Sequence, residues 1–289
     1  MEKVVAVVGP TAAGKTELAV KLAKKFNGEL VSVDSRQVYK GMNIGTAKDE
    51  SYPQHLVDIL SPRTIFNVLR FKNLCLRAIR QILKKGKLPI LVGGSGLYFN
   101  AVVYNLKIPK VKADSKLRAA LGESETSELL EKLRQLDPEA AQLTGENKRR
   151  IIRALEVILK TGGRFSSERQ KGKPLFDTLI IGLRVPREEL YERINKRIDE
   201  QIEKGLVEEV KSLVKIYGED AYALQSTIAY KELLPYLHGE ITLEKAVEEI
   251  KRNSRRFARR QMTWFRAQPD IHWTDSHKKA GKLAEKFLE

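Results

Sequence analysis

Short apolar runs alternate with helical periodicities along the first hundred residues. β-Branched runs of buried type predict strands, and apolar residues four apart, such as Leu18, Leu22 and Phe26, predict a helix. The predicted strands are residues 3–8, 30–33 and 88–92, and the predicted helices are residues 16–26 and 65–85. Strands that alternate with helices indicate a parallel sheet with helices on both faces.

The pattern changes in the middle of the chain and returns near its end. Residues 107–177 carry many charges, several turn signals and helical periodicity, which predicts an α-helical insertion over residues 110–177. Residues 179–185 again form an apolar run, as a strand would. Further amphipathic helices are predicted at residues 187–204, 206–217 and 242–267. We therefore expect the sheet domain to comprise residues 1–109 and 178–289.

A glycine-rich turn joins the first predicted strand to the first predicted helix. Its sequence matches G-x-x-x-x-G-K-[ST] in the strand-to-helix context of a phosphate-binding loop. The loop residues assigned to diphosphate binding are Gly9, Pro10, Thr11, Ala12, Ala13, Gly14, Lys15 and Thr16. Backbone N–H groups and the helix N-terminus attract an anion, Lys15 adds a positive charge, and Thr16 is a candidate Mg²⁺ ligand. A turn that is merely rich in small residues is the alternative.

With this loop in place, the predicted fold class is α/β: a P-loop-type parallel sheet flanked by helices, with an inserted small all-α domain. The loop indicates a diphosphate group and does not identify the molecule that carries it. Nucleoside triphosphate hydrolysis, kinase chemistry and allylic diphosphate chemistry all remain open on this evidence.

The composition favours a polyanionic partner. Lys and Arg number 53 against 37 Asp and Glu, a net charge of +16, which suits nucleic acid, although a basic protein without such a partner has the same count. The single cysteine, Cys75, excludes an intramolecular disulfide and fits a reducing cytoplasm. No leader peptide and no run of eighteen apolar residues is present, so we expect no membrane span. No self-complementary apolar helix stands out, and a monomer is expected.

Asp34 follows the second predicted strand, where ligands of open parallel sheets bind. Its carboxylate is a candidate metal ligand or proton acceptor, and capping of the next helix is the simpler role. The neighbours Ser35, Arg36 and Gln37 add a hydroxyl, a cation and an amide, more than a cap requires. Gln37 is a candidate partner for an extruded base, or an ordinary surface amide. Residues 93–98 follow the third strand and either approach a substrate or form a tight turn into the next helix.

Six segments of the chain, taken in order, resemble the tRNA dimethylallyltransferases, also called tRNA isopentenyltransferases. They are GPTAAGKT at 9–16, DSRQVYKGMNIGTAK at 34–48, PQHLVDI at 53–59, LVGGSGLYF at 91–99, RRIIRALEV at 149–157 and RRFARRQMTWFR at 255–266. The resemblance covers nearly the whole chain. It implies transfer of a dimethylallyl group from dimethylallyl diphosphate to the exocyclic amine of the adenine 3′ of the anticodon, with Mg²⁺ as cofactor.

The resemblance also implies roles for single residues. Asp34 resembles the general base, while Lys15 and Thr16 match diphosphate binding and catalysis. Ser95 and Arg118 align with polar positions at the substrate channel and are assigned to tRNA binding. The target adenine must leave the stack of the anticodon loop to react, so we group Asp34, Ser35, Arg36 and Gln37 with the tRNA-binding residues.

Two basic segments are candidate tRNA surfaces. Residues 251–266 contain seven cations and no acid, so no acidic i,i+4 partner within the segment neutralises them. Its candidate contacts are Arg252, Arg255, Arg256, Arg259 and Arg260. The second segment contributes Arg149, Arg150 and Arg153, which the resemblance places at the anticodon loop. The usual alternative for such charge runs is a solvated helix face.

The chain departs from the family pattern in one segment, and other functions remain open. The family's IGYKE appears here with Ala229 in place of glycine, and Ser226 stands where relatives carry Gln or Arg. A base or diphosphate contact at Ser226 is therefore not expected. The alternatives are an adenylate isopentenyltransferase, a phosphate-loop kinase or ATPase, and an RNA-binding module that uses its loop as a nucleotide switch.

Overall fold

The computed structural model describes residues 1–289, with the exception of the Arg169 side chain. The chain forms two compact units, one of Met1–Val102 with Leu175–Glu289 and one of Val103–Pro174. The predicted insertion, residues 110–177, begins and ends later than the second unit does. The Lys107 amide donates to the Gln170 carbonyl at 2.9 Å, which ties the first connecting segment to the second unit, and the Asp177 N–H donates to the Glu2 carbonyl at 2.9 Å, which ties the end of the predicted insertion to the sheet.

The first unit is built on a six-stranded parallel sheet with the order β3-β2-β4-β1-β5-β6. The strands are β1 (Lys3–Val8), β2 (Gly28–Ser32), β3 (Gln54–His55), β4 (Leu88–Gly93), β5 (Asp177–Leu183) and β6 (Ile271–Thr274). The four predicted strands are confirmed to within a few residues. β3 and β6 were not predicted, because both are short and lie at the sheet edges. The parallel sheet and its flanking helices confirm the predicted fold class.

Alternate strand residues enter two different layers, as the strand period of two requires. Val5 and Val7 of β1 and Ile90 of β4 join a core cluster with α1 (Lys15–Lys25) and α13 (His277–Leu288). Ala6 and Leu91, which are register partners and buried, point to the other face. Helix α2 (Val68–Lys84) packs against β2 and β4. Burial on both faces explains why the strands read as continuous apolar runs.

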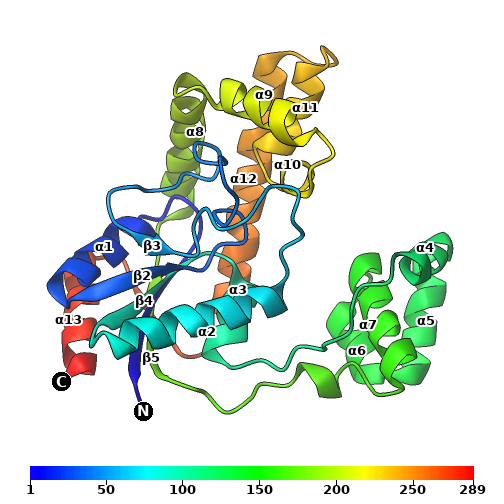
Figure 1. The fold of residues 1–289 in the computed structure, drawn as a ribbon, viewed down its shortest axis with the longest axis horizontal. Helices are drawn as coiled ribbons and strands as arrows, with labels where there is room; N and C mark the ends of the chain where they lie inside the picture. The colour runs from blue at the N-terminus through cyan, green and yellow to red at the C-terminus, as the bar shows by residue number, and fades with distance from the viewer. The chain divides into compact units, whose positions relative to one another are not determined.

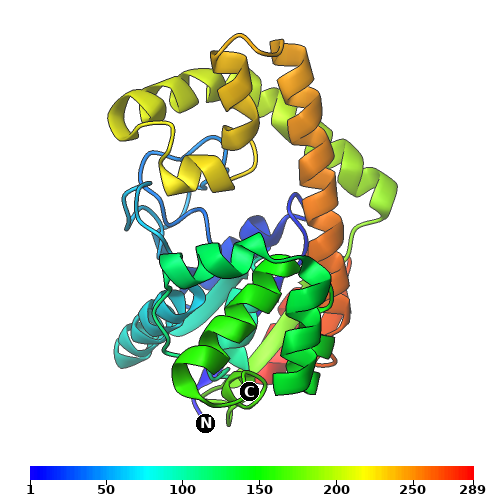
Figure 2. The ribbon, with the colours of Figure 1, turned by 90° about the vertical axis from the view of Figure 1, so that its right-hand side faces the viewer.

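A group of helices stands beyond the carboxyl end of the sheet within the first unit (Figure 1). They are α8 (Arg187–Glu203), α9 (Leu206–Tyr217), α10 (Tyr222–Ser226), α11 (Tyr230–Leu237) and α12 (Leu243–Arg266). Figure 2 shows α12 as one long helix that runs from this group down to the level of the sheet. The helices predicted at 187–204, 206–217 and 242–267 are confirmed to within one residue. Helices α8 and α12 thus stand over the strand ends where a ligand of a parallel sheet binds.

The second unit is helical and has its own core. It contains α4 (Ser115–Glu123), α5 (Thr126–Leu136), α6 (Pro138–Thr144), α7 (Lys148–Thr161) and the 3₁₀ turn Ser167–Arg169, while α3 (Gly96–Val103) ends at its boundary. Leu133, Ile151 and Leu155 are fully buried in one cluster of this unit.

Among the described residues, no helix combines the length and the apolar character that a bilayer crossing requires.

Candidate active site

The phosphate-binding loop has the backbone that its glycines permit. Gly14 caps α1 with a φ of 84°, a left-handed conformation that glycine adopts without a Cβ penalty. The Lys15 Nζ donates to the Pro10 carbonyl at 2.6 Å, across the loop. Burial and, to a smaller extent, the Arg197 charge lower the pKa of Lys15, Asp34 partly offsets both, and the resulting pKa is about 8. Lys15 therefore shares one electrostatic environment with Arg197 and Asp34.

Asp34 extends from the end of β2, and its two carboxylate oxygens differ. Oδ1 accepts the backbone N–H groups of Arg36 at 2.7 Å and Gln37 at 3.3 Å, so this oxygen caps the following turn. Oδ2 accepts no hydrogen bond from any residue that the structure describes, and Asp34 lines a cavity. The capping role and the chemical role are therefore compatible, because each uses a different oxygen.

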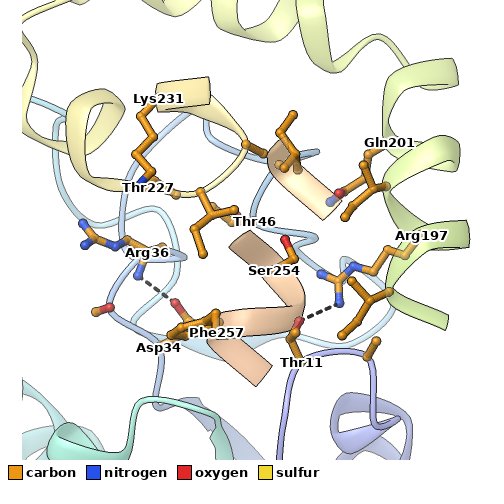
Figure 3. Close-up of a pocket in the computed structure, with 18 of the residues that line it drawn as sticks. Thr11, Asp34, Arg36, Thr46, Arg197, Gln201, Thr227, Lys231, Ser254 and Phe257 are labelled. Carbon is orange, nitrogen blue, oxygen red and sulfur yellow. Dashed lines mark hydrogen bonds between the residues drawn. The ribbon is translucent and has the colours of Figure 1, made fainter. Parts of the chain in front are cut away.

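The cavity has a volume of about 340 Å³ and brings together segments distant in sequence (Figure 3). Its lining includes Thr11 and Ala12 of the phosphate loop, Asp34, Ser35 and Arg36 after β2, Thr46, Ser95 after β4, Arg197 and Gln201 of α8, residues 226–229 with Lys231, and Ser254 and Arg260 of α12. Figure 3 shows Asp34 and Thr11 on one wall, with Thr227 and Lys231 opposite. Among the charged lining residues there are four cations and one acid, so the cavity attracts an anion.

Arg197 is a site residue that the sequence analysis missed. Its Nη1 donates to the Thr11 hydroxyl at 3.4 Å, and burial lowers its pKa against the raising effects of Asp34 and Glu200. A signal for it existed: Arg197 is spaced i+3 from buried Ile194 and i−4 from buried Gln201, so it borders the inward face of α8. A cation bordering the buried face of a helix indicates a buried anionic partner or a ligand.

Apolar side chains form another part of the cavity wall. Ile194 and Ile198 of α8 face Ile250 and Phe257 of α12 across packed helices. Polar lining groups of the same two helices, such as Arg197 and Ser254, lie among these side chains, so the cavity presents charged and apolar surfaces together. An amphiphilic ligand with a charged head and a short hydrocarbon tail matches that combination.

The glycines after β4 are explained by close approaches. A Cβ on Gly93 would lie 2.1 Å from the Val33 carbonyl oxygen, and one on Gly96 would lie 2.2 Å from the Trp264 ring. Gly94 has the same restriction against Gln261. The motif is therefore a tight turn on which α12 docks. Its Ser95 lines the cavity, and the Ser95 hydroxyl accepts the Ser35 N–H at 3.2 Å.

Gln37 does not reach the cavity. Its Oε1 accepts from the Ser32 hydroxyl at 2.9 Å, and its Nε2 lies within hydrogen-bonding distance of the Thr46 and Ala47 carbonyls. Both ends of the amide are used inside the loop, so Gln37 orders this loop, and its predicted contact with an extruded base stays a prediction. Gln37 supports Thr46, which does line the cavity.

The segment where the chain departs from its relatives also borders the cavity. Ser226 accepts the Arg36 Nη1 at 2.7 Å and lines the cavity, where it orients Arg36; the expectation that Ser226 makes no base or diphosphate contact stays a prediction. The Thr227 hydroxyl is buried without a hydrogen-bond partner among the described residues. Ala229 adopts a φ of 79° and ψ of −38°, a strained conformation for a residue with a Cβ. Both features raise the energy of this wall.

The arginines of α12 are less free than the sequence suggested. Arg252 is paired with Glu249, and the Arg255 Nη1 donates to Asn195 of α8 at 2.7 Å. Glu249, which precedes the basic segment, and Asn195 of α8 supply these partners, which corrects the expectation of an unneutralised stripe. Arg256 and Arg259 are exposed and form no ion pair among the described residues, and Arg260 lines the cavity. Three of the five predicted contacts, Arg256, Arg259 and Arg260, are thus without an ion pair to a described residue and free for phosphate binding.

In the second unit, the predicted RNA contacts divide in the same way. Arg118 and Arg153 both bind the fully buried carboxylate of Glu156, with Arg118 Nη2 at 2.7 Å and Arg153 Nη1 at 2.5 Å. Burial on its own would raise the pKa of Glu156, but these bonds and the Asp114 N–H outweigh it and lower that pKa to about 2. Arg149 and Arg150, at the start of α7, are exposed.

Two side-chain oxygens near the phosphate loop are suitable ligands for Mg²⁺. The Thr16 hydroxyl, on the first turn of α1, makes no side-chain hydrogen bond to a described residue, and Asp34 Oδ2 is also unengaged. Mg²⁺ takes one or two such protein oxygens and completes its shell with phosphate and water. Among the described residues, no group of three or more His, Cys, Asp or Glu side chains forms a dedicated metal cage.

Comparison with known proteins identifies the family. The IPP transferase pattern matches residues 37–268, and the isopentenyl transferase pattern matches residues 2–55. The tRNA dimethylallyltransferase of Geobacillus thermodenitrificans is 46% identical over 99% of this chain and 95% of its own length, and that of Anoxybacillus flavithermus is 45% identical over 95% and 90%.

Solved structures agree with these sequence matches. The tRNA isopentenylpyrophosphate transferase of Bacillus halodurans is 42% identical with a TM-score of 0.74, and covers 100% of this chain and 96% of its own. A eukaryotic dimethylallyltransferase acting on tRNA is 29% identical with a TM-score of 0.85, and covers 100% and 80%. With the phosphate loop, the Asp34 carboxylate and the cation-rich cavity in one place, this chain belongs to the IPP transferase family.

Proposed function

We propose that this protein transfers a dimethylallyl group from dimethylallyl diphosphate to the exocyclic amine of an adenine in tRNA and releases diphosphate. One observation carries the proposal: a single cavity joins a phosphate-binding loop, a carboxylate with a free oxygen, an excess of positive charge and an apolar wall. Relatives that share about 45% of their residues with this chain are named tRNA dimethylallyltransferases.

The reaction needs a base and a stabilised leaving group. The amine lone pair forms a C–N bond to the allylic carbon while the C–O bond to diphosphate breaks, and diphosphate leaves with the electron pair. The amine must also lose a proton, because it becomes cationic as the bond forms. Asp34 is the proposed acceptor of that proton through Oδ2, the oxygen that does not cap the turn.

Cations of the cavity stabilise the departing charge. Arg197 donates to Thr11 of the phosphate loop, and Lys15 belongs to that loop. The two positive charges repel each other, and a bound diphosphate would attract both of them. Thr16 and the diphosphate oxygens would hold Mg²⁺, which supplies further neutralisation of the leaving group when bound. Ile194, Ile198 and Phe257 would pack on the prenyl tail and keep water from the allylic carbon.

The tRNA acceptor would approach from the basic surfaces. We propose that the target is the adenine 3′ of the anticodon, extruded into the cavity beside Arg36 and Lys231. Arg256, Arg259 and Arg260 of α12 would contact the RNA backbone, and the helical unit would bind the anticodon stem-loop through Arg149 and Arg150. RNA bases in loops can be splayed out in this way because they are not held in a duplex.

We further propose that the protein acts as a cytoplasmic monomer. Its one cysteine, Cys75, is buried, and burial raises the pKa of that thiol, so it is not a reactive or bridging group. Light scattering after size exclusion should give a mass near the 32.8 kDa of one chain. A dimer that persists on dilution would refute the monomer.

Mass spectrometry of tRNA tests the proposed function. Unmodified tRNA is incubated with protein, Mg²⁺ and dimethylallyl diphosphate, then digested and analysed for a prenylated adenosine next to the anticodon. Parallel reactions offer adenosine monophosphate as acceptor, or ATP alone. Modification of the tRNA only is expected. Prenylated nucleotide without prenylated tRNA would identify an adenylate enzyme, and phosphate release from ATP would identify a hydrolase.

A further inference from the structure

Gln261 of α12 links the two sides of the cavity from behind its walls. The side chain is 6% exposed and does not line the cavity. Its Oε1 accepts the backbone N–H of Thr11 at 2.8 Å, and its Nε2 donates to the carbonyl of Gly94 at 2.9 Å. An amide in this orientation satisfies one backbone donor and one backbone acceptor at once.

The contact at Thr11 orients the phosphate-binding loop. The Thr11 N–H points to Gln261 and is therefore not a group that binds the ligand. Its fixed direction turns the Thr11 hydroxyl into the cavity, where Arg197 donates to it. Gln261 thus acts on the diphosphate end of the cavity through a backbone group.

The contact at Gly94 orients the base end. Ser95, the next residue, lines the cavity and accepts the N–H of Ser35, which follows Asp34. Gly94 itself has no room for a side chain, since a Cβ there would lie 2.1 Å from the Gln261 Nε2. The amide and the glycine therefore fit each other. Together they connect the Thr11 backbone to the strand end that carries Asp34, and so fix the separation between the two.

We infer that Gln261 is a positioning residue, which sets the phosphate-binding loop at a fixed separation from the strand end that carries Asp34. This role rests on the proposed function, because it assigns the loop to the leaving group and Asp34 to the acceptor. Helix α12 contributes two different things to the site: exposed arginines toward solvent and one buried amide toward the loop. A misplacement of about 1 Å between reacting groups lowers rates by about a hundredfold, so a positioning role has a measurable size.

The test is a comparison of Gln261→Met with Gln225→Met, an exposed glutamine whose amide bonds only to the Glu219 carbonyl. Methionine has a similar length and lacks both hydrogen bonds. Calorimetric titration with inorganic diphosphate and Mg²⁺ should show about tenfold weaker binding for Gln261→Met. Steady-state assays should show a higher KM for dimethylallyl diphosphate, a kcat/KM reduced by about ten- to a hundredfold, and an unchanged KM for tRNA. Gln225→Met should match the wild type.

Gly94→Ala perturbs the same contact from the other side, because its new methyl group meets Gln261 and leaves that side chain's chemistry intact. It should likewise raise the KM for dimethylallyl diphosphate and leave the KM for tRNA unchanged. Unchanged diphosphate binding in both folded variants would overturn the inference, as would equal losses for diphosphate and tRNA, or unfolding of both variants. The titration is independent of prenyl transfer: if the wild type binds diphosphate but modifies no tRNA, the proposed function fails while the role of Gln261 is still measured.

Discussion

The cavity of the first unit and the core of the second unit both hold charged side chains, but their charges are balanced differently. In the second unit, the buried Glu156 carboxylate receives two arginines and a backbone N–H, so each charge has its partner within the protein. The cavity has four lining cations and one lining acid, Asp34; Lys231 also pairs with Glu232 at 3.5 Å, whereas Arg197 forms no ion pair with a described residue. Buried charge without a partner costs free energy, and a protein retains it where a ligand supplies the partner.

The same contrast extends to neutral groups. The cavity wall includes a buried hydroxyl without a described partner, Thr227, and a strained residue, Ala229. Thr144 is a buried hydroxyl in the second unit, and it donates to the Ala141 carbonyl at 3.1 Å. The difference teaches that internal satisfaction marks a region that stabilises the fold, whereas unsatisfied charge, unpaired polar groups and strain mark a region shaped for binding.

Among the substitutions that test this contrast, the largest effect should come from removal of a cavity cation. Arg197→Met should lower kcat/KM for dimethylallyl diphosphate by about 10²–10³, because the variant loses charge stabilisation of the leaving group. Its free energy of unfolding should be unchanged or slightly higher, since an unpaired cation is gone. Arg193→Met, one turn earlier on α8 and exposed beside Glu189, is the matched control and should keep wild-type kinetics. A loss of stability in Arg197→Met without a loss of activity would break the comparison.

Removal of Glu156, the acid whose charge is balanced by two arginines, should reduce stability and leave ligand binding unchanged. Glu156→Ala should lower the free energy of unfolding by about 2–3 kcal/mol, less than for a fully buried pair because both arginines reach solvent. Diphosphate affinity should be unchanged. Urea denaturation measures the first quantity and titration the second. Glu131→Ala, which removes the exposed pair with Arg134, should cost less than about 0.5 kcal/mol.

The same acid predicts a pH dependence for the second unit. The pKa of Glu156 is about 2 in the folded protein, below its ordinary value of 4.5, so its stabilisation is present above about pH 4.5 and is lost as pH falls toward 2. Arg118 and Arg153 stay charged throughout, so the loss comes from protonation of the acid. Glu156→Ala should therefore show a weaker decline of stability between pH 4.5 and pH 3 than the wild type, and equal declines would show that other groups control this range.

Lys15 predicts a smaller pH effect on binding in the first unit. Its pKa is lowered to about 8, so its charged fraction falls as pH rises through that value. Affinity for dimethylallyl diphosphate should fall by up to about tenfold between pH 7 and pH 9. Lys15→Met should bind more weakly at pH 7 and show a flatter profile. An equally steep profile in the variant would assign the titration to another group.

The smallest effect should be a gain in stability at the strained wall. Ala229→Gly relieves a conformation that an alanine adopts at a cost of about 1–2 kcal/mol, less the larger backbone entropy of an unfolded glycine. The net gain should be about 1 kcal/mol, measured by thermal unfolding. Ala119→Gly, within helix α4, is a control of opposite sign and should lose about as much. If both substitutions destabilise, the wall is not strained.

Local patterns predicted the elements that bury apolar faces and failed where long-range pairing decides. The sequence analysis predicted β1, β4, α8, α9 and α12, and the structure contains each of them. Their signals, apolar runs and amphipathic periodicity, depend only on residues that are close together in the sequence. The roles of Arg197 and Gln261 could not be assigned, because they depend on partners far away in sequence. Likewise, the sequence did not indicate that Arg118 and Arg153 both bind the buried carboxylate of Glu156.

The central claim is that Asp34 takes the proton while the phosphate loop holds the leaving group. The most direct test is Asp34→Asn in a single-turnover assay with saturating tRNA and dimethylallyl diphosphate. Asparagine keeps an oxygen that can accept the Arg36 and Gln37 N–H groups, so the turn survives and only the base is removed. Substrate affinities should stay within a few-fold of the wild type while prenyl transfer slows by about 10²–10⁴. Transfer at close to the wild-type rate would contradict the account.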